Sequence, residues 1–328
     1  MSTRRGAHGR RAATAAALLA ATVTAALAAG CTAESGPGDD GRGSPKESKQ
    51  GASPSATGPS ALVVKIDNAA AARPHTGVDA ADVVYAEQVE GGLSRLMAVY
   101  ATRLPETVGP VRSARESDLE LLRQFDRPTL AFSGAQKKLL PLIDKAPLRA
   151  ETPGNAADAY FRGSGRPAPH NLFLRPERIV PKPPGEAALT TGFHYGPAPE
   201  GGTATNSRTV RYPAARFTFT WSDSRERWLV GMDGTPATTA DGERMAAATV
   251  VVQYVKVRES AFRDFLGNNT PYTETVGSGK AQVLRDGRAW DVDWKREKAT
   301  DGTAFTTGDD APVNFAEGPV WVVFAKTP

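Results

Sequence analysis

Ten polar residues, at the ends of expected strands, in loops or at the start of an expected helix, are the candidates for chemistry. Three are predicted to move protons: Asp67, Glu87 and His170. Seven are predicted to bind a ligand: Asn68, Glu90, Arg95, Arg112, Ser113, Arg115 and Asn171. Arginine recognises phosphate and carboxylate through paired N–H donors, and a carboxylate with a histidine can act as acid and base. If these side chains converge on one cleft, they predict an anionic ligand.

Glu87 is the polar residue of an otherwise apolar strand face within residues 83–90. A glutamate in such surroundings either pairs with a cation or has a raised pKa. The catalytic interpretation makes it an acid or base, and the structural alternative is an ion pair with Arg95 on the next strand. Glu90 faces the other way in a regular strand, so Asp67 is the expected partner of Glu87 in a two-carboxylate mechanism.

Arg112 and Arg115 flank Ser113, which has capping-box spacing with Glu116. Unpaired N–H groups at a helix start and two arginines together favour a bound anion. The alternative is that both arginines pair with Glu116 and Asp118 as solvated charges.

His170 follows prolines at 167 and 169, which restrict its backbone. It is the candidate for proton transfer or for a hydrogen bond to the ligand, and the alternative is a structural hydrogen bond. No second histidine or cysteine lies at metal-ligand spacing, so neither a metal nor a cofactor is predicted.

These residues need a mixed framework of strands and helices to position them. Alternating apolar patterns predict strands at 61–66, 82–90, 93–102 and 129–132, and helical spacing predicts helices at 114–124 and 135–143. Gly91-Gly92 predicts a hairpin turn, because both residues can adopt positive φ. Residues 150–190 are rich in proline and glycine and are expected to form a long functional loop or a poorly ordered connection.

From residue 206 the pattern becomes that of short alternating strands, which predicts a mainly antiparallel sheet. The expected strands are 216–221, 227–232, 248–257, 281–284, 289–294 and 320–324. Trp290 and Trp294 share one strand face, where a core role is favoured over a sugar-stacking platform. The fold class is therefore α+β, with an N-terminal α/β domain at 61–190 and a mainly β domain at 206–328.

The first thirty residues have the order of a secretory signal: four arginines, an uncharged run and small residues before Cys31. Cys31 is the single cysteine of the chain, and we expect it to be lipidated and to anchor the protein on the extracytoplasmic face of the cell membrane. Cleavage after an Ala-x-Ala site and an uncleaved anchor are the alternatives. Residues 32–60 lack large apolar side chains, which predicts a disordered tether.

Composition and missing motifs exclude several classes of protein. The net charge of +4 disappears when the four signal arginines are subtracted, since 40 − 4 basic residues face 36 acidic ones. Nucleic acid is therefore not an expected partner. The motifs G-x-S-x-G, G-x-x-x-x-G-K and H-E-x-x-H are absent, which disfavours the common exported hydrolases.

The motifs together resemble the YerB family of bacterial lipoproteins. The matching stretches include Val64–Asn68, Arg73–Gly77, Ala81–Gly92, Gly109–Arg115, Pro169–Leu172 and Trp294–Arg296. The resemblance implies a lipid-anchored two-part module and supplies no catalytic residues.

Two functions remain open on the sequence. In the first, the N-terminal module binds, and in one version hydrolyses or transfers, cell-wall glycan, another anionic envelope polymer or a lipid-linked precursor. In the second, the protein is a non-enzymatic scaffold or regulator of cell-wall machinery, whose protein partners are unknown. The second predicts separate salt bridges and an exposed apolar or strand-edge patch in place of a polar cleft.

Overall fold

A computed structural model describes residues 60–263 and 267–327. Cys31 and the expected signal and tether lie outside the described residues. The main element is a sheet of eleven strands. In sheet order these are β19 (Ala304–Thr306), β18 (Arg288–Arg296), β17 (Gly277–Arg285), β14 (Thr249–Val255), β20 (Val320–Lys326), β2 (Val83–Gln88), β3 (Ser94–Tyr100), β1 (Leu62–Asp67), β4 (Thr129–Ala131) and β5 (Arg149–Glu151), with β8 (Thr203–Ala204) paired to β18.

Smaller elements surround this sheet. A five-stranded sheet contains β9 (Ser207–Tyr212), β10 (Ala215–Ser222), β11 (Arg227–Met232), β12 (Thr235–Pro236) and β13 (Ala246–Ala247), and two hairpins are β6 (Tyr160–Arg162) with β7 (Leu172–Leu174) and β15 (Val257–Arg263) with β16 (Asn269–Thr273). The α-helices are α1 (Glu116–Leu122) and α2 (Leu140–Lys145), and short 3-10 helices cover Ala70–Ala72, Val78–Ala80, Glu90–Gly92, Pro176–Arg178 and Glu186–Ala188. No helix in the described residues is both long and apolar enough to cross a membrane.

Strand directions confirm the α+β class, with a mixed N-terminal sheet and mainly antiparallel C-terminal strands. Strands β2, β3 and β1 are antiparallel neighbours, whereas β4 runs parallel to β1. Strand β20 is the exception in the C-terminal part, because it runs parallel to both β14 and β2. The ranges 61–190 and 206–328 thus share one sheet, and their division into two domains stays a prediction.

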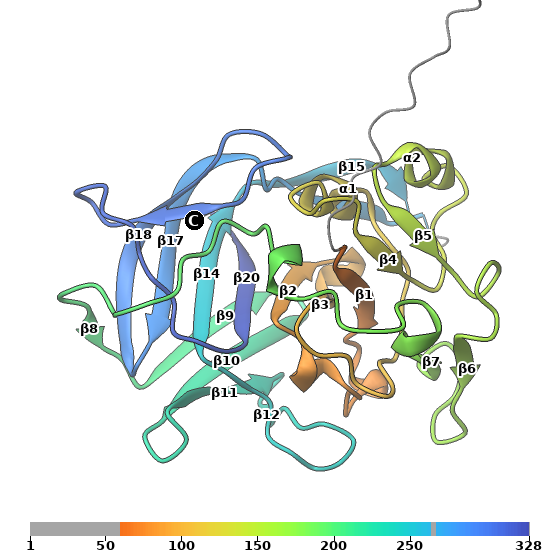
Figure 1. The fold of residues 1–328 in the computed structure, drawn as a ribbon, viewed down its shortest axis with the longest axis horizontal. Coiled ribbons are helices and arrows are strands. Elements are labelled where there is room, and N and C mark those ends of the chain that lie inside the picture. The colour runs from red at the N-terminus through yellow and green to blue at the C-terminus, as the bar shows by residue number, and fades with distance from the viewer. Residues whose placement is uncertain (1–59, 264–266, 328) are drawn as a thin grey trace, which may run out of the picture. The chain divides into compact units, whose positions relative to one another are not determined.

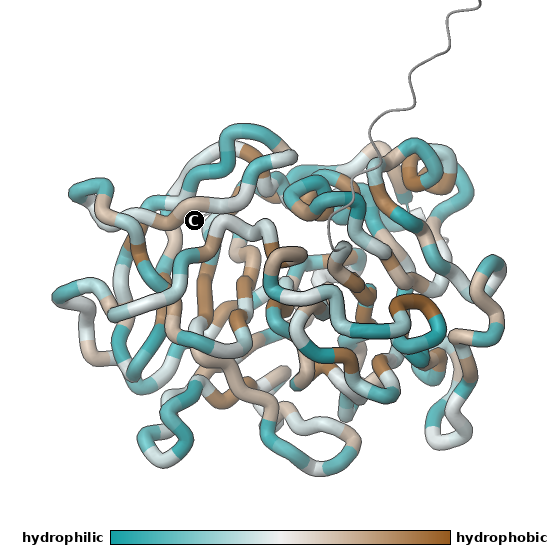
Figure 2. Tube along the Cα trace, viewed as in Figure 1, coloured by the Kyte–Doolittle hydropathy of each residue, from teal (hydrophilic) through white to brown (hydrophobic). Residues whose placement is uncertain are grey.

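Apolar side chains cover both faces of the main sheet. One face packs against the five-stranded sheet, where Trp321 contacts Phe217 and Phe219 at ring-centroid distances of 6.3 and 6.0 Å. The other face packs against α1 and α2 through residues such as Leu121 and Ile143. Figure 1 shows the helices above the β1–β4 end of the sheet, and β11 and β12 below the part that contains β14 and β20. In Figure 2 the brown, hydrophobic segments concentrate in the inner strands and the outer loops are mostly teal.

The hairpin predicted at Gly91-Gly92 is present between β2 and β3. Gly91 and Gly92 have φ of 67° and 71°, in the left-handed region where a side chain costs free energy. A Cβ on Gly92 would also lie 2.5 Å from the side chain of Pro213. The turn therefore requires glycine for conformation and for packing.

Helix α1 begins later than predicted, and Ser113 does not cap it. The Asp118 carboxylate accepts the backbone N–H of Arg115 at 2.7 Å, so the cap is formed two residues further along. The hydroxyl of Ser113 lies 3.3 Å from that of Ser133 instead. The capping box predicted from Ser113 and Glu116 was wrong, because Arg115 is the last extended residue before the helix.

The C-terminal end of α1 is held by Arg296 of β18, which is 1 % exposed. Its guanidinium donates to the carbonyl oxygens of Glu120 and Leu121 at 3.0 and 3.3 Å. Helix ends leave such carbonyls without partners, so this arginine replaces an internal cap. The Glu120 carboxylate also accepts the hydroxyl of Tyr272 at 3.0 Å. Helix α1 is thus clamped by residues that follow it by about 150 positions or more.

Two other expectations need correction. The helix predicted at 135–143 occupies 140–145, with Pro141 in its first turn, where the missing N–H is tolerated. Residues 150–190 contain the hairpin β6–β7 and do not form one long unstructured loop. Trp290 and Trp294 are 5 % and 3 % exposed, in agreement with the core interpretation.

Candidate functional site

Asp67, Arg95 and Glu87 form one row across three neighbouring strands. The register places Asp67 of β1 opposite Arg95 of β3, and Arg95 opposite Glu87 of β2. Residues that oppose each other in this way project from the same face with Cβ atoms about 5 Å apart. By strand alternation this is the face covered by α1. The row therefore lies on the helix-covered face, at the end of β1, the end of β2 and the start of β3.

Lys65 precedes Asp67 by two residues on the same face of β1, and it forms ion pairs with two buried carboxylates. Its Nζ lies 2.7 Å from Asp118 Oδ1 and also contacts Glu87 Oε1, and Lys65 and Asp118 are fully buried. Ser117 donates to the other oxygen of Glu87 at 3.1 Å. The sequence interpretation missed Lys65, although a lysine inside the apolar run Leu62–Ile66 was the signal for a buried charge.

Glu87 does form an ion pair, but the predicted partner, Arg95, was wrong. The partner is Lys65. Burial raises the pKa of Glu87 to about 7, and the negative charge of Asp118 adds to the rise while Lys65 opposes it. One cation between two buried carboxylates leaves a net negative charge, which a proton on Glu87 removes. At 5 % exposure, Glu87 is enclosed by these partners.

Glu90 pairs with Arg115 in two parallel contacts, Nε to Oε1 at 2.6 Å and Nη2 to Oε2 at 2.8 Å. Thr270 of β16 donates to the same carboxylate at 2.7 Å. Burial raises the pKa of Glu90, but the hydrogen bonds and charge of Arg115 outweigh it and hold the pKa below its usual value. The expectation that Glu90 faces away from Glu87 was wrong, because β2 ends at Gln88 and both carboxylates contact residues 115–118.

Asp67 joins His170 and Arg112 at the outer end of the row. Its Oδ2 lies 2.8 Å from His170 Nδ1 and 3.4 Å from Arg112 Nε. Asp67 is 4 % exposed, while the side chains of His170 and Arg112 are 22 % and 25 % exposed. The hairpin β6–β7 brings His170 here because Val111 N donates to Leu172 O and Asp67 N donates to Pro110 O.

Arg95 lies between these groups without a carboxylate partner within ion-pair distance among the described residues. Its Nη1 donates to the carbonyl of Ser113 at 3.2 Å. Burial lowers the pKa of Arg95 to about 10, and the charges of Arg115 and Arg112 add to that effect. The Nε of Arg112 is buried and makes no hydrogen bond of good geometry. These two guanidinium groups therefore retain unused capacity for an anion.

The two candidate asparagines are engaged by the protein. Asn68 donates to Ser94 Oγ at 2.8 Å and accepts from Arg73 Nε at 3.0 Å. Asn171 donates to the carbonyl of Gly163 at 3.0 Å and accepts from Arg162 Nη1 at 2.7 Å. Both amides thus hold loops around the site.

Two domains of one known family match most of the chain. Residues 49–187 match the N-terminal domain, and residues 208–322 the C-terminal domain, of a family described as "Protein of unknown function (DUF3048)". The chain belongs to the DUF3048 family. The resemblance to YerB is confirmed by a relative from Bacillus subtilis (strain 168) named "Putative lipoprotein YerB", which is 24 % identical over 279 residues, or 80 % of either chain.

The crystal structure of the YerB protein from Bacillus subtilis has the same fold. It superimposes with a TM-score of 0.70 at 20 % identity, covering 82 % of this chain and 91 % of that one.

In this DUF3048 protein, two buried groups give stability opposite dependences on pH. The pKa of Glu87 is raised from 4.5, so its contribution is complete below about pH 4.5 and is lost as the pH rises through about 7. Burial lowers the pKa of His75 from 6.5 to about 4, so its contribution is lost as the pH falls through that range. Its Nε2 lies 2.9 Å from the carbonyl oxygen of Asp67, so a neutral His75 supports the site.

We expect Glu87→Gln to remove the first dependence. In urea unfolding from pH 4.5 to 7.5, the stability of the wild type relative to Glu87→Gln should fall as the pH rises, because the wild type alone must ionise a buried carboxyl group. The His75 contribution is present in both proteins and cancels. A constant difference across this range would contradict the raised pKa of Glu87.

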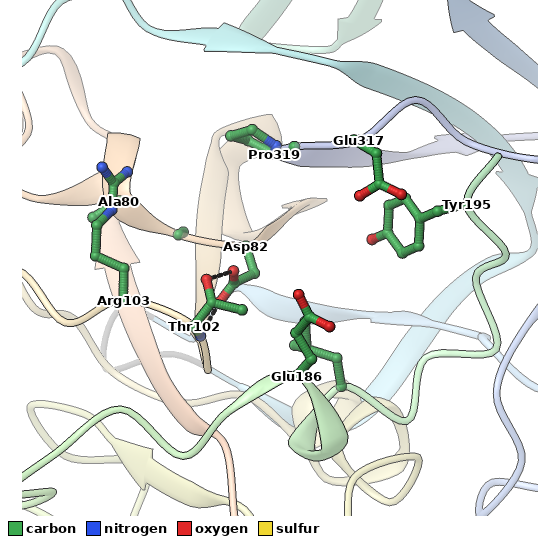
Figure 3. A pocket seen from close by; sticks show the side chains of 11 residues that line it. Ala80, Asp82, Thr102, Arg103, Glu186, Tyr195, Glu317 and Pro319 are labelled. Atoms are coloured by element: carbon green, nitrogen blue, oxygen red, sulfur yellow. Dashed lines mark hydrogen bonds between the residues drawn. The ribbon is translucent and has the colours of Figure 1, made fainter. Parts of the chain in front are cut away.

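The opposite edge of the same strands is acidic. There a cavity of about 530 Å³ is lined by Asp82, Glu186, Glu317 and Tyr195, which Figure 3 shows around one space. Asp82 is held by the backbone N–H groups of Ala101 and Thr102, at 2.7 and 3.0 Å. Arg103 is the single cation of its lining, so the three carboxylates leave this cavity with a net negative charge that disfavours an anion. Within the described residues, no cluster of three His, Cys, Asp or Glu side chains has the geometry of a metal site.

Proposed function

We propose that this protein is a lipid-anchored extracytoplasmic protein that binds an anionic envelope polymer or its lipid-linked precursor at Arg95 and Arg112. The observation that carries the proposal is a charge imbalance: Arg112 and His170 contact the single carboxylate of Asp67, and Arg95 has no carboxylate within ion-pair distance among the described residues. Arginine binds phosphate and carboxylate in a planar, bidentate manner. An anion would supply the missing negative charge.

The membrane location rests on Cys31, which lies outside the described residues. It follows a basic segment, an uncharged run and small residues, as in exported lipoproteins. The name of the Bacillus subtilis relative supports the same modification. An anchor at Cys31 would hold the module against the envelope, where anionic polymers and lipid-linked precursors are the available ligands.

Hydrolysis or transfer of the ligand would depend on Asp67 and His170. Asp67 holds Nδ1 of the His170 ring, which leaves Nε2 without a hydrogen-bond partner in the described part of the chain. An imidazole oriented in this way can exchange a proton with a bound ligand. Glu87 is less suited to that step, because its carboxylate is enclosed by Lys65 and Ser117.

A non-enzymatic scaffold is the second candidate, and two observations favour it. The carboxylates of Glu87 and Glu90 are used in internal ion pairs. Helix α2 also exposes Leu140 and Leu142, at 38 % and 43 % of their surface. An exposed apolar pair beside the short strand β5 is the kind of surface that binds another protein.

The test is a binding measurement with the full chain in detergent, using purified wall glycan and lipid-linked precursors. We expect Arg112→Ala to weaken binding by about tenfold to a hundredfold, since a charge-assisted hydrogen bond contributes about 1.5–3 kcal/mol. Arg178→Ala is the matched control, because that side chain is 57 % exposed and pairs with its own neighbour Glu177.

Equal affinities of wild type and a folded Arg112→Ala variant would reject the anion site. Mass spectrometry of the same mixtures would detect a product and so separate an enzyme from a binding protein. Neither binding nor product would favour the scaffold.

A further inference from the structure

The strands that carry the candidate site all end at one edge of the main sheet. Strands β1 and β2 each run antiparallel to β3, so they point the same way, and β20 runs parallel to β2. Asp67, Gln88 and Lys326 are the last residues of β1, β2 and β20. Adjacent strands are about 4.8 Å apart, so the end of β20 lies about 14 Å along this edge from the end of β1.

A cavity of about 610 Å³ opens at the β20 end of this edge. Arg211 of β9 and Lys326 of β20 line it, together with Arg258 and Thr270 of the hairpin β15–β16 and with Gln88. The cavity therefore lies where both smaller sheets meet the edge that carries Asp67 and Arg95.

The charge of this cavity is positive. Three cations, Arg211, Arg258 and Lys326, and one carboxylate, Glu259, belong to its lining. Arg211 and Lys326 are exposed, and neither has an ion-pair partner in residues 60–263 and 267–327. Arg258 stacks on Tyr272 at 3.9 Å and its Nε pairs with Glu274 Oε1 at 3.0 Å, so the positive charge without an ion-pair partner in the cavity comes from Arg211 and Lys326.

Thr270 connects the cavity to the candidate site. It lines the cavity and also donates to Glu90, the carboxylate that pairs with Arg115. Arg115 in turn adjoins Ala114 and Ser113, whose carbonyl accepts from Arg95. A short chain of direct contacts thus separates the two groups of cations.

We infer that this cavity is a second anion subsite and that the ligand is a polyanion with negative groups spaced to reach both Arg112 and Lys326. The inference rests on the proposed function, because it extends the same ligand along the same edge. The acidic cavity around Asp82, Glu186 and Glu317 at the opposite edge would repel such a chain, which gives it one preferred path.

The test compares a long and a short anion on the full chain in detergent: long-chain inorganic polyphosphate and pyrophosphate. The double variant Arg211→Ala/Lys326→Ala should bind the long chain about tenfold or more weakly and pyrophosphate about as well as the wild type, because only the long chain occupies both subsites. The control is Arg178→Ala/Lys182→Ala, which removes the same charge from exposed positions elsewhere.

Poly-L-glutamate, measured alongside, identifies whether phosphate or carboxylate is the preferred group. Equal long-chain affinity of the double variant and its control would overturn the second subsite. If Arg112→Ala changes neither affinity while the double variant still weakens long-chain binding, the site at Arg112 fails and the cavity stands as an anion site by itself.

Discussion

Replacing Lys65 with methionine is expected to lower the free energy of unfolding by about 3–5 kcal/mol, the usual cost of removing one partner of a buried ion pair. Lys65 is fully buried between Glu87 and Asp118. Without it, two carboxylates remain in the core with no cation between them. Equilibrium unfolding in urea, followed by circular dichroism, measures the loss.

The matched control is Lys280→Met, because Lys280 pairs with Asp293 at 2.7 Å but is 76 % exposed. Exposed pairs contribute about 0–1 kcal/mol. Adding Glu87→Gln to Lys65→Met should restore part of the stability, since it removes one of the stranded charges. A Lys65→Met variant as stable as the wild type would mean that the buried group does not depend on its cation.

Replacing Asp67 with asparagine is expected to tighten anion binding by about tenfold while abolishing any turnover. Asp67 is the single carboxylate in contact with Arg112, so it competes with a bound anion for that guanidinium. Removing the negative charge of Asp67 should make the binding free energy of a nearby anion more favourable by about 1.4 kcal/mol or more, where the effective dielectric constant is near 20. Asparagine keeps an oxygen for the N–H of Ala69, which Asp67 Oδ1 accepts at 3.2 Å.

The measurement is the affinity for the anion that binds the wild type, with product formation followed by mass spectrometry. Asp291→Asn is the control, because it removes the same charge from an exposed position of β18. Weaker binding by Asp67→Asn would show that this carboxylate chiefly positions Arg112 and His170.

Local patterns predicted the elements whose causes are local. The hairpin β2–β3 follows from two glycines in the left-handed region, and the C-terminal strands follow from alternating side chains between turns. Helix boundaries were less accurate. The spacing of Ser113 and Glu116 did not reveal that the helix starts two residues later, where the Asp118 carboxylate accepts the N–H of Arg115.

Partners of charged residues could not be predicted in the same way. The structural alternative paired Arg115 with Glu116 and Asp118, close in sequence, whereas its ion-pair partner is Glu90, 25 positions away. Lys65 was overlooked because its two carboxylates come from β2 and α1, 22 and 53 positions away. Such choices depend on which helix covers which strand.

The sequence by itself determined the α+β class, the hairpin, the candidate residues and the family resemblance, because these depend on residue type and short spacing. The tertiary structure decided that β20 lies between β14 and β2, that Arg296 caps α1, and that His170 meets Asp67 across 103 positions. Contacts over such separations arise from burial of two faces of one sheet at once. No local pattern encodes which distant strand completes that sheet.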